Sequence, residues 1–120
     1  MDMICTTEDA DGVSRFEERA IALTPGDFAP PAPSMPISAS EPVSALLHLV
    51  LPAGWTGARH PTPRRQMGYL LKGRVRVETG DGESREFGAG AIWRMEDTAG
   101  SGHRTTVLGD EDVHMAIVQF

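Results

Sequence analysis

Short apolar runs, separated by glycine, proline and aspartate, fill the chain after Pro42. The runs are too short for ordinary helices and are rich in branched and aromatic residues, a composition typical of β-strands. In order they are SALLHLVL, QMGYLL, VRVET, REF, AIWRM, HRTTVL and VHMAIVQF. Short strands that recur roughly every 8 to 12 residues predict an antiparallel all-β sandwich or barrel.

Two local patterns refine this prediction. The stretch TGDGES, residues 79–84, places an Asp-Gly pair between alternating VRVE and a second short strand, which predicts a hairpin. The segment FEERAIAL, which begins at Phe16, fits a short helix and a first strand equally well.

The first third of the chain differs from the rest. Residues 1–14 are polar and acidic without apolar periodicity, which predicts a flexible terminus. Residues 15–43 are expected to form an N-terminal strand and an extended Pro-rich strap, because six of the nine prolines lie between Leu23 and Pro42. We expect the strap to pack along the following domain or a neighbouring subunit, with a flexible linker as the alternative. Residues 44–120 then form the barrel.

Composition limits the partners. A chain of 120 residues fits one domain. A formal charge of -6 without basic runs argues against nucleic acid or a membrane surface and favours a small-molecule partner. The chain has no apolar stretch of about 20 residues and no signal-peptide pattern at its start, so we expect a cytoplasmic protein. Cys5 is the only cysteine, and its polar surroundings predict neither burial nor catalysis.

The stretch GWTGARHPTPRRQMGYLLKG, residues 54–73, carries the candidate chemistry. If it is extended, alternation turns one set of side chains toward the barrel interior and another set away from it. Pro61 and Pro63 cannot donate to a strand ladder, so the polar end should lie at an edge or rim. The inward set is His60, Thr62, Arg64, Gln66, Gly68 and Leu70, and the outward set is Arg65, Met67, Tyr69 and Leu71.

The spacing of this stretch is similar to the first motif of the cupins. Gly54 and Gly73 stand at the two glycine positions and His60 at the first histidine, whereas Thr62 replaces the second histidine and Gln66 the acid. The second cupin motif is matched more loosely. Gly100 and His103 keep its glycine-histidine spacing, while Thr98 and Val107 stand where proline and asparagine are usual.

The resemblance covers about residues 44–120 and implies a double-stranded β-helix, the jelly-roll barrel, usually as a homodimer. It also implies one divalent metal (Fe, Mn, Ni or Zn) held by His60, Gln66 and His103. Because Gln66 removes the anionic ligand, we expect a weakly held metal or none. The alternative is a rim in which Gln66 and Thr62 only satisfy backbone groups.

Further residues are candidates for ligand binding. Arg64 offers a planar fork suited to a carboxylate or phosphate, which predicts a small anionic ligand; the alternative is a surface arginine paired with Glu96 or Asp97. Glu96 and Asp97 either support His103 or form a solvated turn, and we favour the turn. Trp93 is expected in the core. The other ligand candidates are Thr62, Tyr69, His48 and His114, although a lone histidine in an apolar strand is more often a core residue.

Three functions follow from these observations. The first is a metal-dependent enzyme of isomerase, lyase or dioxygenase type. The second is a metal-free small-molecule-binding or sensory module. The third is a structural barrel with a vestigial pocket, in which the strap and last strand mediate assembly. A shared barrel serves unrelated chemistries, so the resemblance assigns no substrate.

Overall fold

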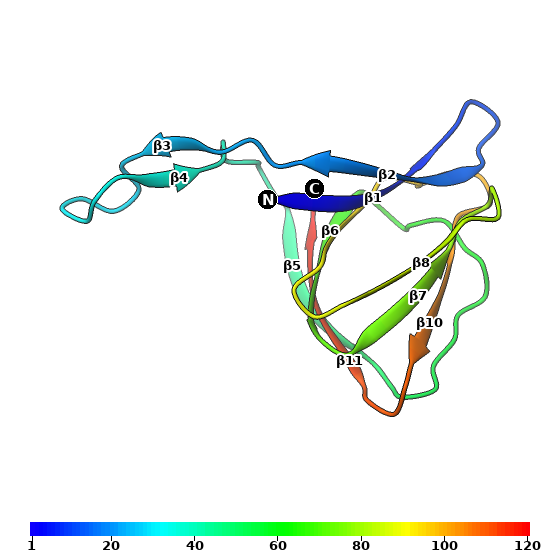
Figure 1. The fold of residues 1–120 in the computed structure, drawn as a ribbon. Helices are drawn as coiled ribbons and strands as arrows, with labels where there is room; N and C mark the ends of the chain where they lie inside the picture. The colour runs from blue at the N-terminus through cyan, green and yellow to red at the C-terminus, as the bar shows by residue number, and fades with distance from the viewer.

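The computed structural model describes residues 1–120 and contains eleven strands joined by turns and loops. It contains no helix, and therefore none that is long and apolar enough to cross a membrane. A six-stranded sheet has the order β2-β1-β9-β6-β11-β5, and a three-stranded sheet has the order β10-β7-β8 (Figure 1). The strands of the large sheet are β1 (Asp2–Glu8), β2 (Ser14–Ala20), β5 (Ala45–Leu51), β6 (Gln66–Lys72), β9 (Ile92–Met95) and β11 (Val113–Gln119). The small sheet contains β7 (Arg74–Glu78), β8 (Ser84–Gly88) and β10 (Arg104–Leu108).

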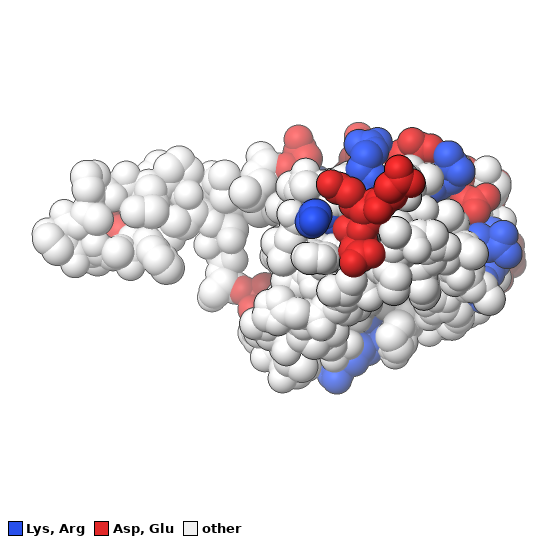
Figure 2. Space-filling view, turned by 90° about the horizontal axis from the view of Figure 1, so that it is seen from below, with Lys and Arg blue, Asp and Glu red and all other residues white.

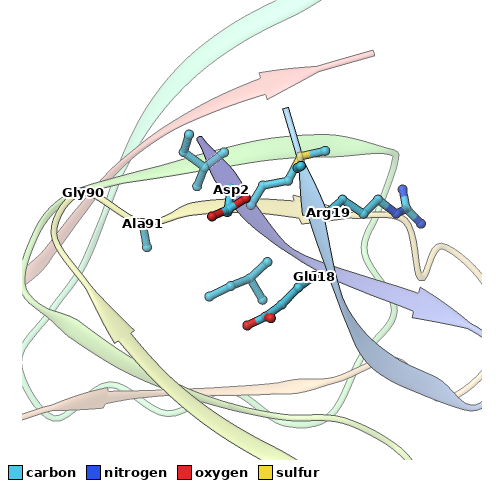
Figure 3. A pocket seen from close by; sticks show the side chains of 9 residues that line it. Asp2, Glu18, Arg19, Gly90 and Ala91 are labelled. Carbon is cyan, nitrogen blue, oxygen red and sulfur yellow. The ribbon is translucent and has the colours of Figure 1, made fainter. Parts of the chain in front are cut away.

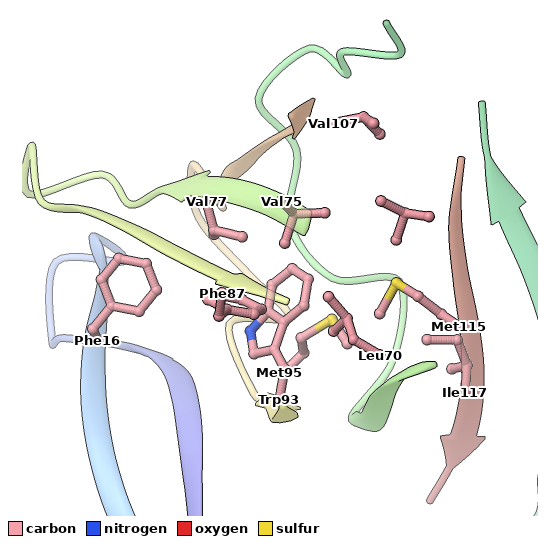
Figure 4. Close-up of a cluster of buried hydrophobic side chains, with 11 residues drawn as sticks. Phe16, Leu70, Val75, Val77, Phe87, Trp93, Met95, Val107, Met115 and Ile117 are labelled. Carbon is pink, nitrogen blue, oxygen red and sulfur yellow. The ribbon is translucent and has the colours of Figure 1, made fainter. Parts of the chain in front are cut away.

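The core lies between the two sheets, as Figure 4 shows. Alternate residues of β7 and β11 point into it, as the period of a strand requires. Its buried members are Phe16, Leu70, Val75, Val77, Phe87, Trp93, Met95, Val107, Val113, Met115 and Ile117. The strands predicted after Pro42 and the hairpin at residues 79–84 are therefore confirmed, with Glu78 paired to Ser84 across the turn.

The N-terminal residues correct the prediction of a flexible terminus. Strand β1 pairs antiparallel with β2 and parallel with β9, so residues 2–8 are part of the large sheet. Cys5 and Thr6 are fully buried, against the expectation for Cys5, and burial raises the pKa of its thiol. The polar sequence is misleading because Thr6 is buried together with hydrogen-bond partners from distant segments. The ambiguous segment at Phe16 belongs to a strand, β2.

An ion-pair network lies at the C-terminal end of β9, an interior strand of the large sheet. Glu96 contacts Arg19 at 2.6 Å, Arg94 at 3.0 Å and Arg65 at 3.2 Å, and Arg94 continues to Glu41 at 2.7 Å. The pKa of the Glu96 carboxyl is lowered overall. Burial acts to raise this pKa, but the hydrogen bonds and charges of Arg94 and Arg19 together outweigh burial. The network joins the chain before β5 to β2 and β9.

Residues 22–43, called the arm below, differ from the predicted strap. They contain a short hairpin of β3 (Thr24–Gly26) and β4 (Met35–Ile37), which pair only with each other. Figure 1 shows this hairpin projecting from the barrel instead of packing along it. The projection raises the radius of gyration to 15.6 Å, against about 14 Å for a compact chain of this length.

Candidate functional site

His60 and His103 form a cross-strand pair. The His60 amide donates to the His103 carbonyl and the His103 amide to the His60 carbonyl, both at 3.0 Å. Residues that exchange both hydrogen bonds place their side chains on the same face. The ring centroids are accordingly 5.7 Å apart. The predicted proximity of these two histidines thus follows directly from backbone pairing.

Gly102 allows this close pairing. Its φ is +68°, a left-handed conformation, and a Cβ on this residue would overlap the His60 carbonyl. Glycine has no Cβ and tolerates positive φ at little cost. Position 102, just before His103, therefore has to be glycine for the segments that carry His60 and His103 to pair.

Asp97 orients His103. The His103 Nδ1 donates to Asp97 Oδ2 at 2.7 Å, while Thr62 and Thr6 donate their hydroxyls to Oδ1 at 2.8 Å and 3.2 Å. Asp97 is 0% exposed and His103 is 3% exposed. The favoured prediction of a solvated turn is therefore wrong for Asp97. A buried carboxylate is tolerated here because three donors satisfy it.

Trp93 completes the buried network. Its indole Nε1 donates to Thr6 Oγ1 at 3.2 Å, and its ring meets the His103 ring edge-on with centroids 5.1 Å apart. Trp93 is 3% exposed, which confirms its predicted place in the core. The His103 ring is thus fixed at Nδ1 by Asp97 and along one edge by Trp93.

His60 is also held through Nδ1, although it is exposed whereas His103 is buried. Its Nδ1 lies 2.7 Å from the Ala58 carbonyl oxygen, which can only accept, so Nδ1 carries the proton in this contact. Both histidines therefore use Nδ1 to donate, and in neutral rings both Nε2 atoms remain as acceptors.

A cavity of about 110 Å³ adjoins the two rings. Its polar lining consists of His60, Thr62, Gln66, His103 and Thr105, which places Thr62 and Gln66 in the same cavity as the two histidines. No lysine or arginine lines it. The remaining lining residues are Leu49, Leu51, Trp55, Pro63, Trp93, Met95, Met115 and Ile117.

The Gln66 amide is already engaged by protein groups. Its Oε1 accepts from Gln119 Nε2 at 3.1 Å, and its Nε2 lies 3.4 Å from Met95 Sδ. The oxygen that a metal would use is therefore shared with a neighbouring strand. Sequence reasoning missed the contribution of Met95, because a methionine in an apolar run carries no signal beyond core packing.

Four predicted ligand residues lie outside the cavity. Arg64 donates to Ser44 Oγ and to the Phe120 carbonyl, each at 3.1 Å, because residues 61–65 are not a regular strand and the inward alternation stops there. It pairs with neither Glu96 nor Asp97. Tyr69, His48 and His114 point away from the core, since their strand neighbours Leu70, Leu49 and Met115 point inward.

A larger hollow of about 390 Å³ lies on the outside, between β1, β2 and the turn before β9. Figure 3 shows Asp2, Glu18 and Arg19 around it, with Gly90 and Ala91 on the far wall. Arg19 is already paired with Glu17 and Glu96. None of the predicted site residues lines this hollow, so the candidate site is the cavity at His60 and His103.

The donors around this cavity do not fit a divalent metal of the kind that the cupin resemblance implies. His60 and His103 supply two ring nitrogens, but no group of three or more His, Cys, Asp or Glu side chains is arranged to hold a metal ion. The Asp97 carboxylate is occupied by Thr6, Thr62 and the Nδ1 side of His103. Divalent ions in proteins usually require further ligands, commonly anionic ones.

Comparison with known families agrees with the fold. The family model described as "Cupin domain" matches residues 47–119, more than half of the chain. The protein therefore belongs to the cupin family. No curated protein matches the chain significantly.

Among solved structures, a Cupin 2 conserved barrel domain protein from Salinispora arenicola CNS-205 is similar with a TM-score of 0.52 and 19% identity, covering 84% of this chain and 77% of the other. The cupin domain of Cnp3 from Schizosaccharomyces pombe has a TM-score of 0.49 and 16% identity, with 98% and 81% covered. The conserved protein SPY1581 of unknown function from Streptococcus pyogenes has a TM-score of 0.47 and 16% identity, with 68% of each chain covered. The first likeness supports the barrel fold and nothing beyond it.

Proposed function

We propose that this cupin barrel binds a small, uncharged organic molecule that carries hydroxyl or amide donors. The proposal rests on one observation: His60 and His103 both use Nδ1 to donate to the protein, which leaves their two Nε2 atoms as acceptors in rings that line a cavity without lysine, arginine or carboxylate side chains. Two neutral acceptors select a ligand that donates hydrogen bonds. Leu49 and Trp55 would contact its apolar part.

The cavity also limits the size and charge of the ligand. Its volume of about 110 Å³ is small beside the roughly 300 to 1,000 Å³ of common ligand pockets, so the ligand has few heavy atoms. An anion would lose its hydration without gaining a lysine or arginine partner. Because Arg64 is engaged elsewhere, the anionic ligand predicted from sequence loses its main support.

The alternative function is a metal-dependent enzyme. Two imidazole rings that bind the same metal ion have ring centroids roughly 5 to 6 Å apart, because each metal-nitrogen bond is about 2 Å long. The centroids of the His60 and His103 rings are 5.7 Å apart, which lies in this range. The missing anionic ligand would have to come from the substrate. The third hypothesis, a vestigial pocket, required an interior filled with side chains, and the cavity argues against it.

The test is a fragment screen by amide and imidazole NMR on untagged protein. Small alcohols and amides should shift the His60 and His103 resonances, whereas matched carboxylates should not. His60→Ala should weaken binding about tenfold or more, since it removes one of two acceptors. His114→Ala is the matched control because His114 lies outside the cavity, and it should leave binding unchanged.

Two results would contradict the proposal. Binding of carboxylates that depends on Arg64 would restore the anionic ligand. Near-stoichiometric zinc, nickel, iron or manganese, lost in His103→Ala, would instead support the metal-dependent enzyme. If neither fragments nor metals bind, the vestigial pocket becomes the better account.

A further inference from the structure

Gly68 leaves a gap in the inner face of the large sheet. It is buried, and it pairs with Trp93 of β9 on one side and with Ile117 of β11 on the other. Gln66 and Leu70 have their side chains on the same inner face, so the glycine interrupts a row of inward side chains. Gly68 has no positive φ, so the backbone does not require glycine here. What matters is the space that the missing side chain leaves.

The ends of two methionines fill this space. A Cβ built on Gly68 would lie 2.8 Å from Met115 Cε and 3.0 Å from Met95 Cε, so both methyl groups meet above the glycine. Figure 4 shows the two side chains entering the same part of the core, Met95 from β9 and Met115 from β11. Methionine is unbranched and has three rotatable bonds, so its end adjusts to its neighbours. The gap is therefore closed by movable groups.

The same methionines form part of the wall of the candidate-site cavity. Met95 and Met115 both line this cavity of about 110 Å³. Along β6 the inner face passes from the half-buried Gln66, which also lines the cavity, to the buried Gly68 two residues further on. Two residues of a strand span roughly 7 Å. A ligand whose donor binds at the two histidines would thus direct its apolar end along β6 toward Gly68.

The charged side chains of the protein lie away from this wall. Figure 2 shows acidic and basic side chains on the outside of the barrel and an arm almost free of them. No aspartate, glutamate, lysine or arginine lines the cavity. An apolar tail that enters the cavity therefore meets no ionised group, and it gains the free energy of leaving water.

We propose that Gly68 and the two methionines above it set the length of the ligand's apolar tail, and that the ligand is a straight-chain molecule with a hydroxyl or amide group at one end. This inference rests on the proposed function for the end that binds at His60 and His103. A straight chain can displace one methionine methyl group at a time, whereas a branched chain has to displace several at once.

The first test is the length dependence of binding, measured by NMR titration with primary alcohols of two to six carbons. Each methylene that enters the cavity should lower the dissociation constant roughly fourfold, until the tail reaches the methionines and the gain stops. In Gly68→Ala the added methyl group pushes the methionine ends into the cavity, so the gain should stop about one carbon earlier. In Met115→Ala, which removes one of these ends, it should stop at least about one carbon later.

Gly109→Ala is the control for a loss of stability. Gly109 does not line the cavity, and a Cβ there meets nothing within 4 Å, so the wild-type length limit should remain. Gly68→Ala should fold, because the atoms closest to its new Cβ are flexible side-chain ends. If Gly68→Ala and Met115→Ala both kept the wild-type limit, the inference would be wrong, while alcohol binding would still support the proposed function.

Xenon separates the inference from the proposed function, because it is apolar and needs no hydrogen-bond acceptor. It should shift the methyl resonances of Met95 and Met115 in wild type, and shift them less in Gly68→Ala. Met67 lines an outer groove instead of the cavity, so its methyl resonance should not respond. Binding of xenon without any alcohol would overturn the proposed function and the ligand class but support the role of Gly68. No response of either methionine to xenon would overturn that role.

Discussion

The carboxylate of Asp97 holds the imidazole of His103 through a hydrogen bond of 2.7 Å between Oδ2 and Nδ1. This contact fixes the orientation of the ring and its tautomer, and leaves Nε2 as the ring's acceptor. Thr6 and Thr62 occupy the other carboxylate oxygen, so Asp97 has little freedom to turn elsewhere. Asp97 is thus the residue that positions His103 for any ligand.

Replacing Asp97 tests this positioning. In Asp97→Asn one oxygen becomes an amide nitrogen, so either His103 or the two threonines lose their acceptor. We expect the free energy of unfolding to fall by about 2–4 kcal/mol, because a buried charged hydrogen-bond network is broken. Urea denaturation measures the change, and imidazole NMR should show loss of the single Nδ1-H tautomer of His103.

Asp110→Asn is the control for that change. Asp110 is exposed in the turn after β10. Its substitution should change the free energy of unfolding by less than about 0.5 kcal/mol. If Asp97→Asn were as mild as this control, and His103 kept its tautomer, Asp97 would not position the ring.

The sequence predicted the pair His60 and His103 but not the support behind it. The resemblance of two short stretches to the cupin motifs located both histidines, because their spacing matches the histidine positions of those motifs. Thr6 lies 91 positions from Asp97, its hydrogen-bond partner, and no local pattern connects them. Long-range parallel pairing of β1 with β9 creates this contact, and such pairing leaves no periodic trace in a polar segment.

Gly102 should be the least replaceable glycine near the site. In Gly102→Ala the new Cβ overlaps the His60 carbonyl in addition to the cost of a positive φ. We expect a loss of about 3 kcal/mol or more in unfolding free energy, or a failure to fold. Gly109 has a similar φ of +73° but nothing within 4 Å of its Cβ position.

Gly109→Ala therefore measures only the cost of placing a residue with a Cβ in a left-handed backbone conformation, which is about 1–2 kcal/mol of unfolding free energy. The difference between the two variants, measured by the same denaturation experiment, is the cost of separating His60 from His103. Equal losses in both variants would mean that the histidine pairing does not depend on close approach at Gly102.

Arg64 shows why the inward alternation failed. Pro61 and Pro63 interrupt the strand ladder, so the face that a side chain takes after them is set by local contacts and not by the period of a strand. Arg64→Ala should lower the free energy of unfolding by less than about 1 kcal/mol, since its contacts are exposed. Fragment binding by NMR should be unchanged, and a loss of binding would return Arg64 to the site.

The ion-pair network at Glu96 predicts how stability depends on pH. The pKa of Glu96 is lowered below its ordinary value of 4.5 by Arg94 and Arg19, which outweigh the effect of burial. A carboxyl with a lowered folded-state pKa stabilises the protein above the unfolded value, and this contribution is lost as pH falls through the folded value. Wild-type stability should therefore drop below about pH 4.5 in part through Glu96.

In Glu96→Gln this part of the pH dependence should disappear, together with about 1–3 kcal/mol of unfolding free energy at neutral pH, because Glu96 is only 18% exposed and binds three arginines. Glu86→Gln is the matched control: Glu86 pairs with Arg76 at 2.6 Å but is 43% exposed, so its loss should cost less than about 1 kcal/mol. The measurement is the free energy of unfolding of wild type, Glu96→Gln and Glu86→Gln, from urea denaturation at pH 3.5 and pH 7. If Glu96→Gln and wild type lost the same stability between these pH values, the network at β9 would contribute nothing to acid sensitivity.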